Sequence, residues 1–300
     1  MRKNRNFQRK KVNRDHDRVD YLKRIQEAAA FLEGRIQGLG AAAPKSPDVG
    51  IILGSGLSGA VPTLQNQVVI SYSDIPGFPK PTVSGHAGKL VLGEMGSLGV
   101  AIMQGRFHYY EGHTMDAITL PVRVLKALGA KKLVLSAAVG SLREEIKPGD
   151  LVFMNDHMNF MGANPLRGYH TKEFGEMFPD LAGAYTPALR RKALELCKKL
   201  KITAHEGVYT AVGGPSYETP AEIRAFAQLG GTVVGMSVVP ESITARQIGM
   251  EVLAFGWISN MAAGLSKENL EHSDVLALGQ KMAGVIRSFL ESLLEGLQEG

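Results

Sequence analysis

Short apolar runs recur along the chain, separated by longer segments of mixed polarity. The runs are VGIIL at 49–53, KLVLG at 89–93, VAIMQG at 100–105, KLVLSAAVG at 132–140, DLVFM at 150–154, TVVGMS at 232–237 and VLAFGWISN at 252–260. A continuous apolar run bounded by turn residues is typical of a strand that is buried on both sides. We therefore predict a buried strand at each of these runs.

The longer segments carry apolar residues at helical spacing. The first spans 19–36 and ends at a Gly-Ala stretch before Pro44; the others lie at 115–128, 187–200, 219–229, 240–248 and 274–296, the last after Ser273 as a candidate N-cap. Strands and helices thus interleave, which predicts an α/β fold with helices on both faces of a sheet. Ligands of such sheets bind at strand ends, where the polar motifs of this chain also fall.

The composition is that of a globular protein. The chain has 300 residues, 44% of them hydrophobic, and holds no apolar run long enough to span a membrane. No linker divides its middle, so we predict one domain over residues 19–300. Cys197 is the only cysteine, which excludes an intrachain disulfide and a cysteine metal site. This cysteine usage favours a cytoplasmic setting.

The positive charge is concentrated at the N-terminus. The formal net charge is +5, and residues 1–24 hold ten Lys or Arg against three Asp. Residues 1–18 lack the apolar stretch of a secretory signal and are too polar to form core, so we predict a basic, disordered tail without a specific role. Weak contact with RNA is the alternative, although a nucleic-acid partner is not the favoured interpretation.

A glycine turn follows the first predicted strand. GSGLSG at 54–59 matches the dinucleotide-binding spacing G-x-G-x-x-G, but Pro62 and a strand near Val68 leave no room for the helix that such a site needs. The remaining interpretation is a tight turn that exposes backbone N–H groups and the Ser55 hydroxyl to a small anion. A purely structural turn is the alternative.

Two further loops carry candidate anion ligands. His86 lies between glycines in SGHAGKLVLG, where a solvated loop histidine is the alternative interpretation. GRFHYYEG at 105–112 offers the planar guanidinium of Arg106, and in an extended strand His108 and Tyr110 would share one side. The structural alternative for this loop is an ion pair between Arg106 and Glu111 with packed tyrosines.

The remaining motifs suit a flat heterocycle. In GGPSYETPAEI, Thr219 as N-cap, Pro220 and Glu222 define a helix start, which leaves Tyr217 and Glu218 on the preceding loop. An aromatic ring beside a carboxylate fits a ring with N–H donors. Further strand ends place Ser237 of GMSVVPES and Asn260 of GWISNMAAG near ligand loops.

In combination and order, these motifs resemble the trimeric, low-molecular-mass purine nucleoside phosphorylases. The matching stretches are GSGL, GHAGKLV, QGRFHYYEG, NPLRG, GPSYETPAEI, GMSVVPE and SNMAAG, and the resemblance runs over about residues 22–296. It implies a three-layer α/β sandwich whose mixed sheet is partly barrel-like, assembled as a homotrimer with active sites near subunit interfaces. No metal or organic cofactor is implied, and inorganic phosphate is a co-substrate.

The resemblance also assigns roles to residues. It implies a phosphate site at Ser55, His86, Arg106, Ala138 and Ser237; a ribose site at Tyr110, Met236 and His272, with Phe174 reaching in from a neighbouring subunit; a base site at Tyr217, Glu218 and Asn260; and catalytic roles for His108, Glu218 and Asn260. His272 and Phe174 rest on the resemblance alone.

The implied activity is reversible phosphorolysis of inosine- and guanosine-type nucleosides to the free purine and the (deoxy)ribose 1-phosphate. One segment departs from the family: SAAVGSLREEIKPGD from Ser136 replaces the usual TNAAGG and is similar to the methylthioadenosine phosphorylases, which are the alternative function. Asn260 argues against that branch, which carries an aspartate there to accept from adenine. A nucleoside-binding protein without catalysis would not need the anion ligands.

Overall fold

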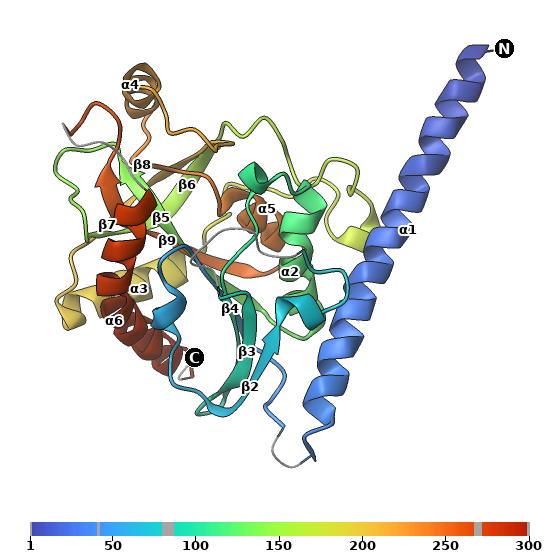
Figure 1. Ribbon diagram of the computed structural model, residues 1–300, viewed down its shortest axis with the longest axis horizontal. Coiled ribbons are helices and arrows are strands. Elements are labelled where there is room, and N and C mark those ends of the chain that lie inside the picture. The colour runs from blue at the N-terminus through green and yellow to red at the C-terminus, as the bar shows by residue number, and fades with distance from the viewer. Residues whose placement is uncertain (1, 41–42, 80–86, 267–271, 299–300) are drawn as a thin grey trace.

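Nine strands form one mixed sheet in the part of the chain that the computed structural model describes, residues 2–40, 43–79, 87–266 and 272–298. The strands are β1 (Val49–Leu53), β2 (Gln65–Ser71), β3 (Lys89–Met95), β4 (Leu98–Gln104), β5 (Lys132–Ser141), β6 (Leu151–Asn159), β7 (Ala204–Ala211), β8 (Val233–Gly235) and β9 (Glu251–Met261). They lie in the order β2-β3-β4-β1-β5-β8-β7-β6-β9 (Figure 1).

Part of this sheet closes on itself. β5 pairs with β9 as well as with β8, so β5, β8, β7, β6 and β9 form a ring, and β1, β4, β3 and β2 extend from it as an open sheet. This confirms the partly barrel-like sheet expected from the sequence. β4, β1, β5 and β9 run parallel to one another, so their carboxyl ends share one edge. The loops after β1 and β4 leave the sheet at that edge, whereas β7 and β8, which precede Tyr217 and Ser237, run antiparallel to β5.

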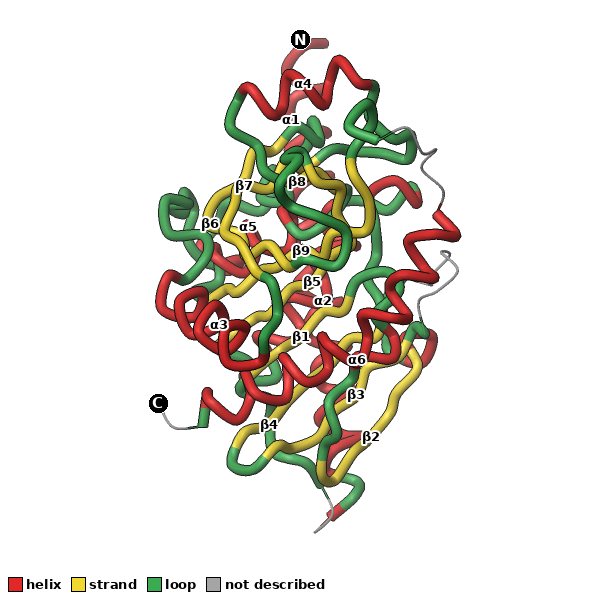
Figure 2. The backbone as a smooth tube through the Cα atoms, turned by 90° about the vertical axis from the view of Figure 1, so that its left-hand side faces the viewer, coloured by secondary structure: helices red, strands yellow, loops and turns green. Residues whose placement is uncertain are grey.

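Helices cover both faces of the sheet, in three layers (Figures 1 and 2). They are α1 (Arg2–Gln37), α2 (Met115–Ala127), α3 (Pro187–Leu200), α4 (Pro220–Gln228), α5 (Val239–Gln247) and α6 (His272–Leu297). Apolar residues of α1, α2 and α5 share one core with one face of the sheet, and those of α3 and α6 share a second core with the other. Because successive strand residues point to opposite faces, Ile52 lies in the first core and Ile51 in the second.

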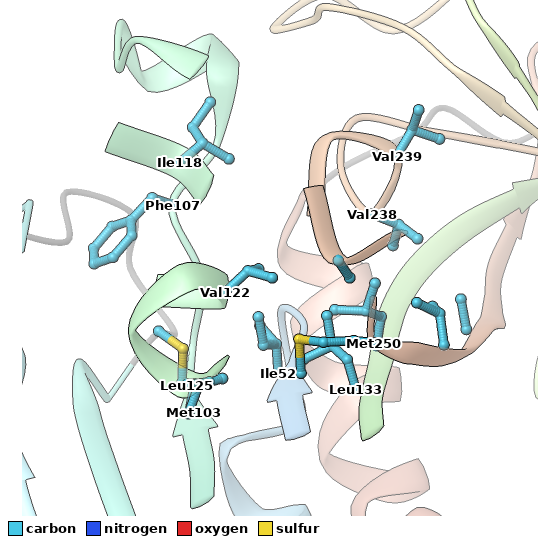
Figure 3. Close-up of a cluster of buried hydrophobic side chains, with 14 of the residues drawn as sticks. Ile52, Met103, Phe107, Ile118, Val122, Leu125, Leu133, Val238, Val239 and Met250 are labelled. Atoms are coloured by element: carbon cyan, nitrogen blue, oxygen red, sulfur yellow. The ribbon is translucent and has the colours of Figure 1, made fainter. Parts of the chain in front are cut away.

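The first core fixes the helices that border the polar loops. Figure 3 shows Ile52 and Leu133 of the sheet beneath Val122 of α2 and Val239 of α5. All four side chains are fully buried, at 0–2% exposure. A close-packed interior of this kind is nearly incompressible, so it limits the movement of the loops that are attached to it.

The structure confirms all seven apolar runs as strands and all six helical segments, with ends that differ by a few residues except at the start of α1, which lies at Arg2 instead of residue 19. β7 was not among the predicted strands because His205 and Glu206 interrupt AHEGVYTA near its start and leave no long apolar run. Ser273 lies inside α6, which begins at His272, rather than at its N-cap. None of the helices in the described residues is both long and apolar enough to cross a membrane.

The basic N-terminal segment differs from its predicted disorder. α1 continues without interruption from Gln37 back to Arg2, and its N-terminal half projects past the body of the protein (Figure 1). Its lysines, arginines and glutamines are good helix formers, and a helix already nucleated by the packed residues Tyr21 to Leu32 extends at little cost. The division into a tail of residues 1–18 and a single domain stays a prediction.

Candidate active site

A cleft at the shared strand edge gathers most of the predicted site residues. Ten of them line it, and they come from six separate loops and strand ends: Ser55, Arg106, His108, Tyr110, Ala138, Tyr217, Glu218, Met236, Ser237 and Asn260. Val275 of α6 adds an apolar wall. Residues that are up to about two hundred positions apart in the sequence therefore face one cavity.

The glycine turn after β1 packs closely against β5. A Cβ atom at Gly54 would lie 2.8 Å from the carbonyl oxygen of Ser136, and the Gly54 N–H donates to Ser136 Oγ at 3.0 Å. Only a short 3-10 turn, Ser58–Ala60, separates this loop from β2. The absence of a helix here confirms that GSGLSG is not a dinucleotide-binding loop, and the turn presents Ser55 to the cleft instead.

The guanidinium of Arg106 contacts three residues and has one nitrogen without a hydrogen-bond partner among the described residues. Its Nε donates to Glu241 Oε1 at 2.9 Å, and its Nη1 lies 2.5 Å from the Ser136 carbonyl oxygen and 3.3 Å from Ser237 Oγ. Its Nη2 is buried and has no hydrogen-bond partner among the described residues. A buried guanidinium nitrogen is costly to leave unpaired. This atom therefore favours a site at which a bound anion accepts its hydrogen bond.

The ion pair with Glu111 that we considered for Arg106 does not form. Glu111 Oε1 instead accepts from the His108 backbone N–H at 2.8 Å and lies 2.9 Å from His108 Nδ1. The loop is a 3-10 turn over Tyr109–Glu111 rather than an extended strand. The His108 and Tyr110 rings still meet, but by stacking at 4.7 Å between centroids.

Burial controls the protonation of this loop. Desolvation lowers the pKa of His108, although the hydrogen bond to Glu111 opposes the shift, so the ring is neutral at pH 7. With Nδ1 facing a carboxylate, the neutral ring carries its proton there and Nε2 is the acceptor. Desolvation also raises the pKa of the Tyr110 hydroxyl to about 12, which keeps it a hydrogen-bond donor.

The predicted helix start is confirmed and places Tyr217 and Glu218 on the loop before it. The Thr219 hydroxyl accepts from Glu222 N at 3.3 Å, and the Thr219 N–H donates to Glu222 Oε2 at 2.7 Å, which completes a capping box. Burial raises the pKa of the Glu218 carboxyl, with the Glu222 charge adding to the shift. A carboxylate that is costly to bury alone suits a ligand that donates N–H groups to it.

Asn260 lies near the end of β9, beside an irregularity in the sheet. The register between β5 and β9 shifts between Val139 and Gly140, and Gly140 then pairs with Asn260. The amide is oriented by a short relay in which Asn260 Nδ2 donates to Ser259 Oγ at 2.8 Å and Ser259 Oγ donates to the Val139 carbonyl at 3.2 Å. Both side chains line the cleft.

Three predicted residues are not in this cleft as described. His86 lies outside the described residues, and His272 begins α6 but its side chain is not described. Phe174 is 2% exposed and lies within its own chain, with its ring 5.8 Å from that of Tyr21 on α1. It would have to leave this packing to reach a neighbouring subunit. In the same segment, Phe178 is 82% exposed.

Sequence reasoning missed the residues that support the site. Glu241, Glu111 and Ser136 are buried partners of Arg106, His108 and Gly54. Glu241 lies in the first turn of α5, in which every residue except Arg246 is buried, and a buried carboxylate needs a partner, but the mixed polarity of VPESITARQ gives no sign of this burial. Nothing in the sequence pairs it with a residue 135 positions away.

Comparison with known proteins agrees with the resemblance to phosphorylases. Residues 48–295 match the family model described as the phosphorylase superfamily. The chain is 45% identical over 273 residues to purine nucleoside phosphorylase 1 of Geobacillus stearothermophilus, covering 91% of this chain and 97% of the relative. It is 47% identical over 265 residues to purine nucleoside phosphorylase 1 of Bacillus subtilis, covering 88% and 95%.

A solved enzyme has a similar fold. The purine nucleoside phosphorylase of Schistosoma mansoni in complex with inosine superposes with a TM-score of 0.82 at 35% identity, covering 91% of this chain and 96% of that one. A purine nucleoside phosphorylase of S. mansoni in complex with adenosine superposes with a TM-score of 0.83 at 37% identity and the same coverage.

Proposed function

Because this chain belongs to the phosphorylase superfamily and, within it, to the purine nucleoside phosphorylases, we propose that it catalyses the reversible phosphorolysis of purine ribonucleosides and deoxyribonucleosides, with inosine and guanosine preferred. The products are the free purine and the pentose 1-phosphate. The observation that carries this proposal is the buried Nη2 atom of Arg106, which has no partner among the described residues and belongs to a residue that lines the same cleft as Glu218 and Asn260.

In the proposed reaction the bond between the sugar C1′ and the purine N9 breaks, and its electron pair goes to the purine. An oxygen of hydrogen phosphate then forms the new bond to C1′, and the proton that this phosphate loses goes to the departing purine. Arg106, Ser55, Ser237 and the backbone N–H of Ala138 hold the phosphate so that its charge supports the cationic sugar and its oxygen is in position to attack. The resemblance adds His86 to these phosphate ligands as a further predicted ligand.

The remaining residues act on the sugar and the base. Tyr110 and Met236 contact the ribose, with His272 as the further predicted ligand, and the neutral His108 accepts a hydrogen bond from phosphate or from a sugar hydroxyl through Nε2. Tyr217 covers the face of the base. Asn260 donates to N7 or O6 while negative charge builds on the purine, and Glu218 accepts from N1–H. The proposed chemistry requires no metal or organic cofactor.

Specificity follows from matching donors to acceptors. Hypoxanthine and guanine offer N1–H to the Glu218 carboxylate, whereas adenine presents an unprotonated N1 and leaves both groups unpaired. Such a mismatch costs about 1–3 kcal/mol. A methylthioadenosine substrate would meet the same mismatch, so the Glu218 and Asn260 pair favours 6-oxopurines.

The decisive experiment compares phosphate-dependent release of base from inosine, guanosine, adenosine and methylthioadenosine. We expect kcat/KM for inosine and guanosine to exceed that for the two adenine nucleosides by about fivefold to 150-fold, the range that a mismatch of 1–3 kcal/mol implies. Rates are needed because an S. mansoni relative has been solved with adenosine as well as inosine. Equal rates for methylthioadenosine and inosine would contradict the proposed preference.

The proposed assembly is a homotrimer in the cytoplasm. The buried Phe174 does not suit a contact with a neighbour, but Phe178 and the half-exposed Met177 of the same segment present apolar surface that another subunit would cover. Sedimentation of the wild type and of Phe178→Ala tests this: a trimer that weakens in the variant supports the assignment. A nucleic-acid partner is not part of the proposal, and unchanged RNA affinity after deletion of residues 1–18 would exclude the tail as such a site.

A further inference from the structure

The connection between β8 and α5 contains a strained turn beside the phosphate ligands. Val238 has φ +67° and ψ −50°, and the Val239 N–H donates to the Ser237 carbonyl oxygen at 2.7 Å. These values define a three-residue γ-turn with positive φ, which is rare and unfavourable for a β-branched residue. Such a conformation persists only where the surroundings hold it in place.

Packing holds one side of this turn. The side chains of Val238 and Val239 are fully buried in the core between the sheet and α2 (Figure 3). Their burial fixes the turn from the side that faces away from the cleft. It does not by itself orient Ser237, whose side chain lines the cleft.

A buried phenol holds the other side. The Ser237 backbone N–H donates to Tyr209 Oη at 3.1 Å, and Tyr209, on the neighbouring strand β7, is 0% exposed. Tyr209 does not line the cleft. Its hydroxyl therefore supports a ligand-binding residue from behind rather than contacting the ligand.

The sheet leaves space for this contact at one glycine. A Cβ atom at Gly235 would lie 2.4 Å from Tyr209 Oη, a distance at which the phenol would have to move. Glycine at 235 is thus required for the hydroxyl to reach Ser237. The hydrogen bond depends on this glycine, since the side chain of any other residue at 235 would displace the phenol.

The turn connects the two residues that position Arg106. Ser237 Oγ lies 3.3 Å from Arg106 Nη1 on one side of the turn, and Glu241 Oε1 accepts from Arg106 Nε at 2.9 Å on the other. Rotation at Val238 would change the distance between these two contacts. The geometry of the guanidinium therefore depends on the γ-turn.

We propose that Tyr209 is a positioning residue for the phosphate co-substrate: its hydroxyl fixes the Ser237 N–H and, through the γ-turn at Val238, aligns the Ser237 hydroxyl and the Arg106 guanidinium on the anion. This inference rests on the proposed phosphorolysis. It assigns the effect of Tyr209 to phosphate alone, because no described base ligand contacts this phenol.

The test measures KM for phosphate and KM for inosine in Tyr209→Phe. Loss of the acceptor leaves a buried N–H unpaired, and we expect KM for phosphate to rise by about tenfold or more while KM for inosine changes by less than about twofold. Tyr21→Phe is the matched control, because Tyr21 is equally buried and its hydroxyl donates to the Asp116 carbonyl oxygen at 2.8 Å on α2. The control should leave both constants unchanged.

A second variant approaches the same contact from the glycine. Gly235→Ala should displace the phenol and raise KM for phosphate by a similar factor, and the double variant with Tyr209→Phe should be no worse than either single one. If Tyr209→Phe does not fold, the KM values of Gly235→Ala for phosphate and inosine decide whether the inference holds.

Two results would overturn the inference while wild-type phosphorolysis stays intact. One is an unchanged KM for phosphate in both variants; the other is an equal rise in both KM values, which would make Tyr209 a general structural residue. If the wild type itself lacks phosphate-dependent release of base, the proposed function fails, and this inference falls with it.

Discussion

Arg106 Nε donates a 2.9 Å hydrogen bond to Glu241 Oε1, with only 2% and 3% of the two side chains exposed. One group belongs to the loop after β4 and the other to the first turn of α5. A buried pair of this kind contributes little when it replaces packed apolar residues, but it is costly to break, because one charge is then left without a partner. The pair thus contributes both to the stability of the fold and to the orientation of Arg106 at the anion site.

Replacing Glu241 with alanine should destabilise the protein strongly. Removal of one partner from a buried ion pair costs about 3–5 kcal/mol. We expect that loss in the free energy of unfolding measured by urea denaturation. Glu27→Ala is the control, since the Lys23–Glu27 pair is 68% and 51% exposed, and it should change stability by less than about 0.5 kcal/mol. Similar losses in the two variants would contradict the buried pairing.

Replacing Arg106 with alanine should weaken the use of phosphate far more than the binding of base. The guanidinium contacts Ser136, Ser237 and Glu241, and none of these is a predicted base ligand. Steady-state kinetics in phosphate should show a KM raised by at least about tenfold, consistent with the loss of a charged hydrogen bond. Calorimetric titration of hypoxanthine in the absence of phosphate provides the comparison, and an equal loss of base affinity would count against the assignment.

Replacing Asn260 with aspartate should shift the preference towards adenine nucleosides. An amide can donate to O6 of an oxopurine, whereas a carboxylate only accepts and so suits a 6-amino group. The ratio of kcat/KM for inosine to that for adenosine should fall by at least about tenfold. Ser259→Ala, which removes the acceptor for Asn260 Nδ2, provides a related check, because it should lower activity on inosine without creating activity on adenosine.

Binding of hypoxanthine should weaken in mild acid. Burial raises the pKa of Glu218, and only its ionised form accepts from N1–H, so the interaction is present above that pKa and is lost as the pH falls through it. The loss should begin at a higher pH than for an ordinary glutamate, whose pKa is about 4.3. Titrations of base between pH 7.5 and pH 4.5 measure it. Glu218→Gln should bind weakly with no such acid limb, and a matching acid limb in that variant would implicate another group.

Stability should also fall below neutral pH because of His157. Burial lowers the pKa of His157 in the folded protein, with the Asp156 charge opposing the shift, while its value in the unfolded chain is about 6.5. The unfolded state therefore binds the proton first as the pH falls, and stability is lost below pH 6.5. Urea denaturation at several pH values should give a shallower slope for His157→Gln than for the wild type. The exposed His170→Gln variant is the control for loss of a histidine.

Local sequence was sufficient for the elements of the fold and for much of the site. The helix start at Thr219 follows from its own capping residues, so the positions of Tyr217 and Glu218 on the loop before it could be predicted and are confirmed. The interpretation of GSGLSG as an anion-type turn likewise depended on nearby residues, since the short interval before β2 leaves no space for a helix. These features are decided by interactions over a few residues.

Predictions about the support of each loop were less successful. His108 and Tyr110 were expected to share one side of an extended strand, but the structure stacks their rings in a 3-10 turn held by Glu111. The assignment of Phe174 to the site of a neighbouring subunit rests on the resemblance and stays a prediction; within its own chain the ring packs against Tyr21 of α1. In each case the outcome depends on a hydrogen bond or contact that periodicity does not report.

The residue types at the strand ends follow from the local sequence, because buried strands need apolar runs and turns need glycine and capping residues. Which of those strand ends meet depends on the packing of the complete chain. The closure of β5 on β9 brings Asn260 beside Gly140, and the burial of α5 brings Glu241 to Arg106 across 135 positions. Such pairings are set by the packing of the whole core, in which each contact is stabilised by many others distant in the chain.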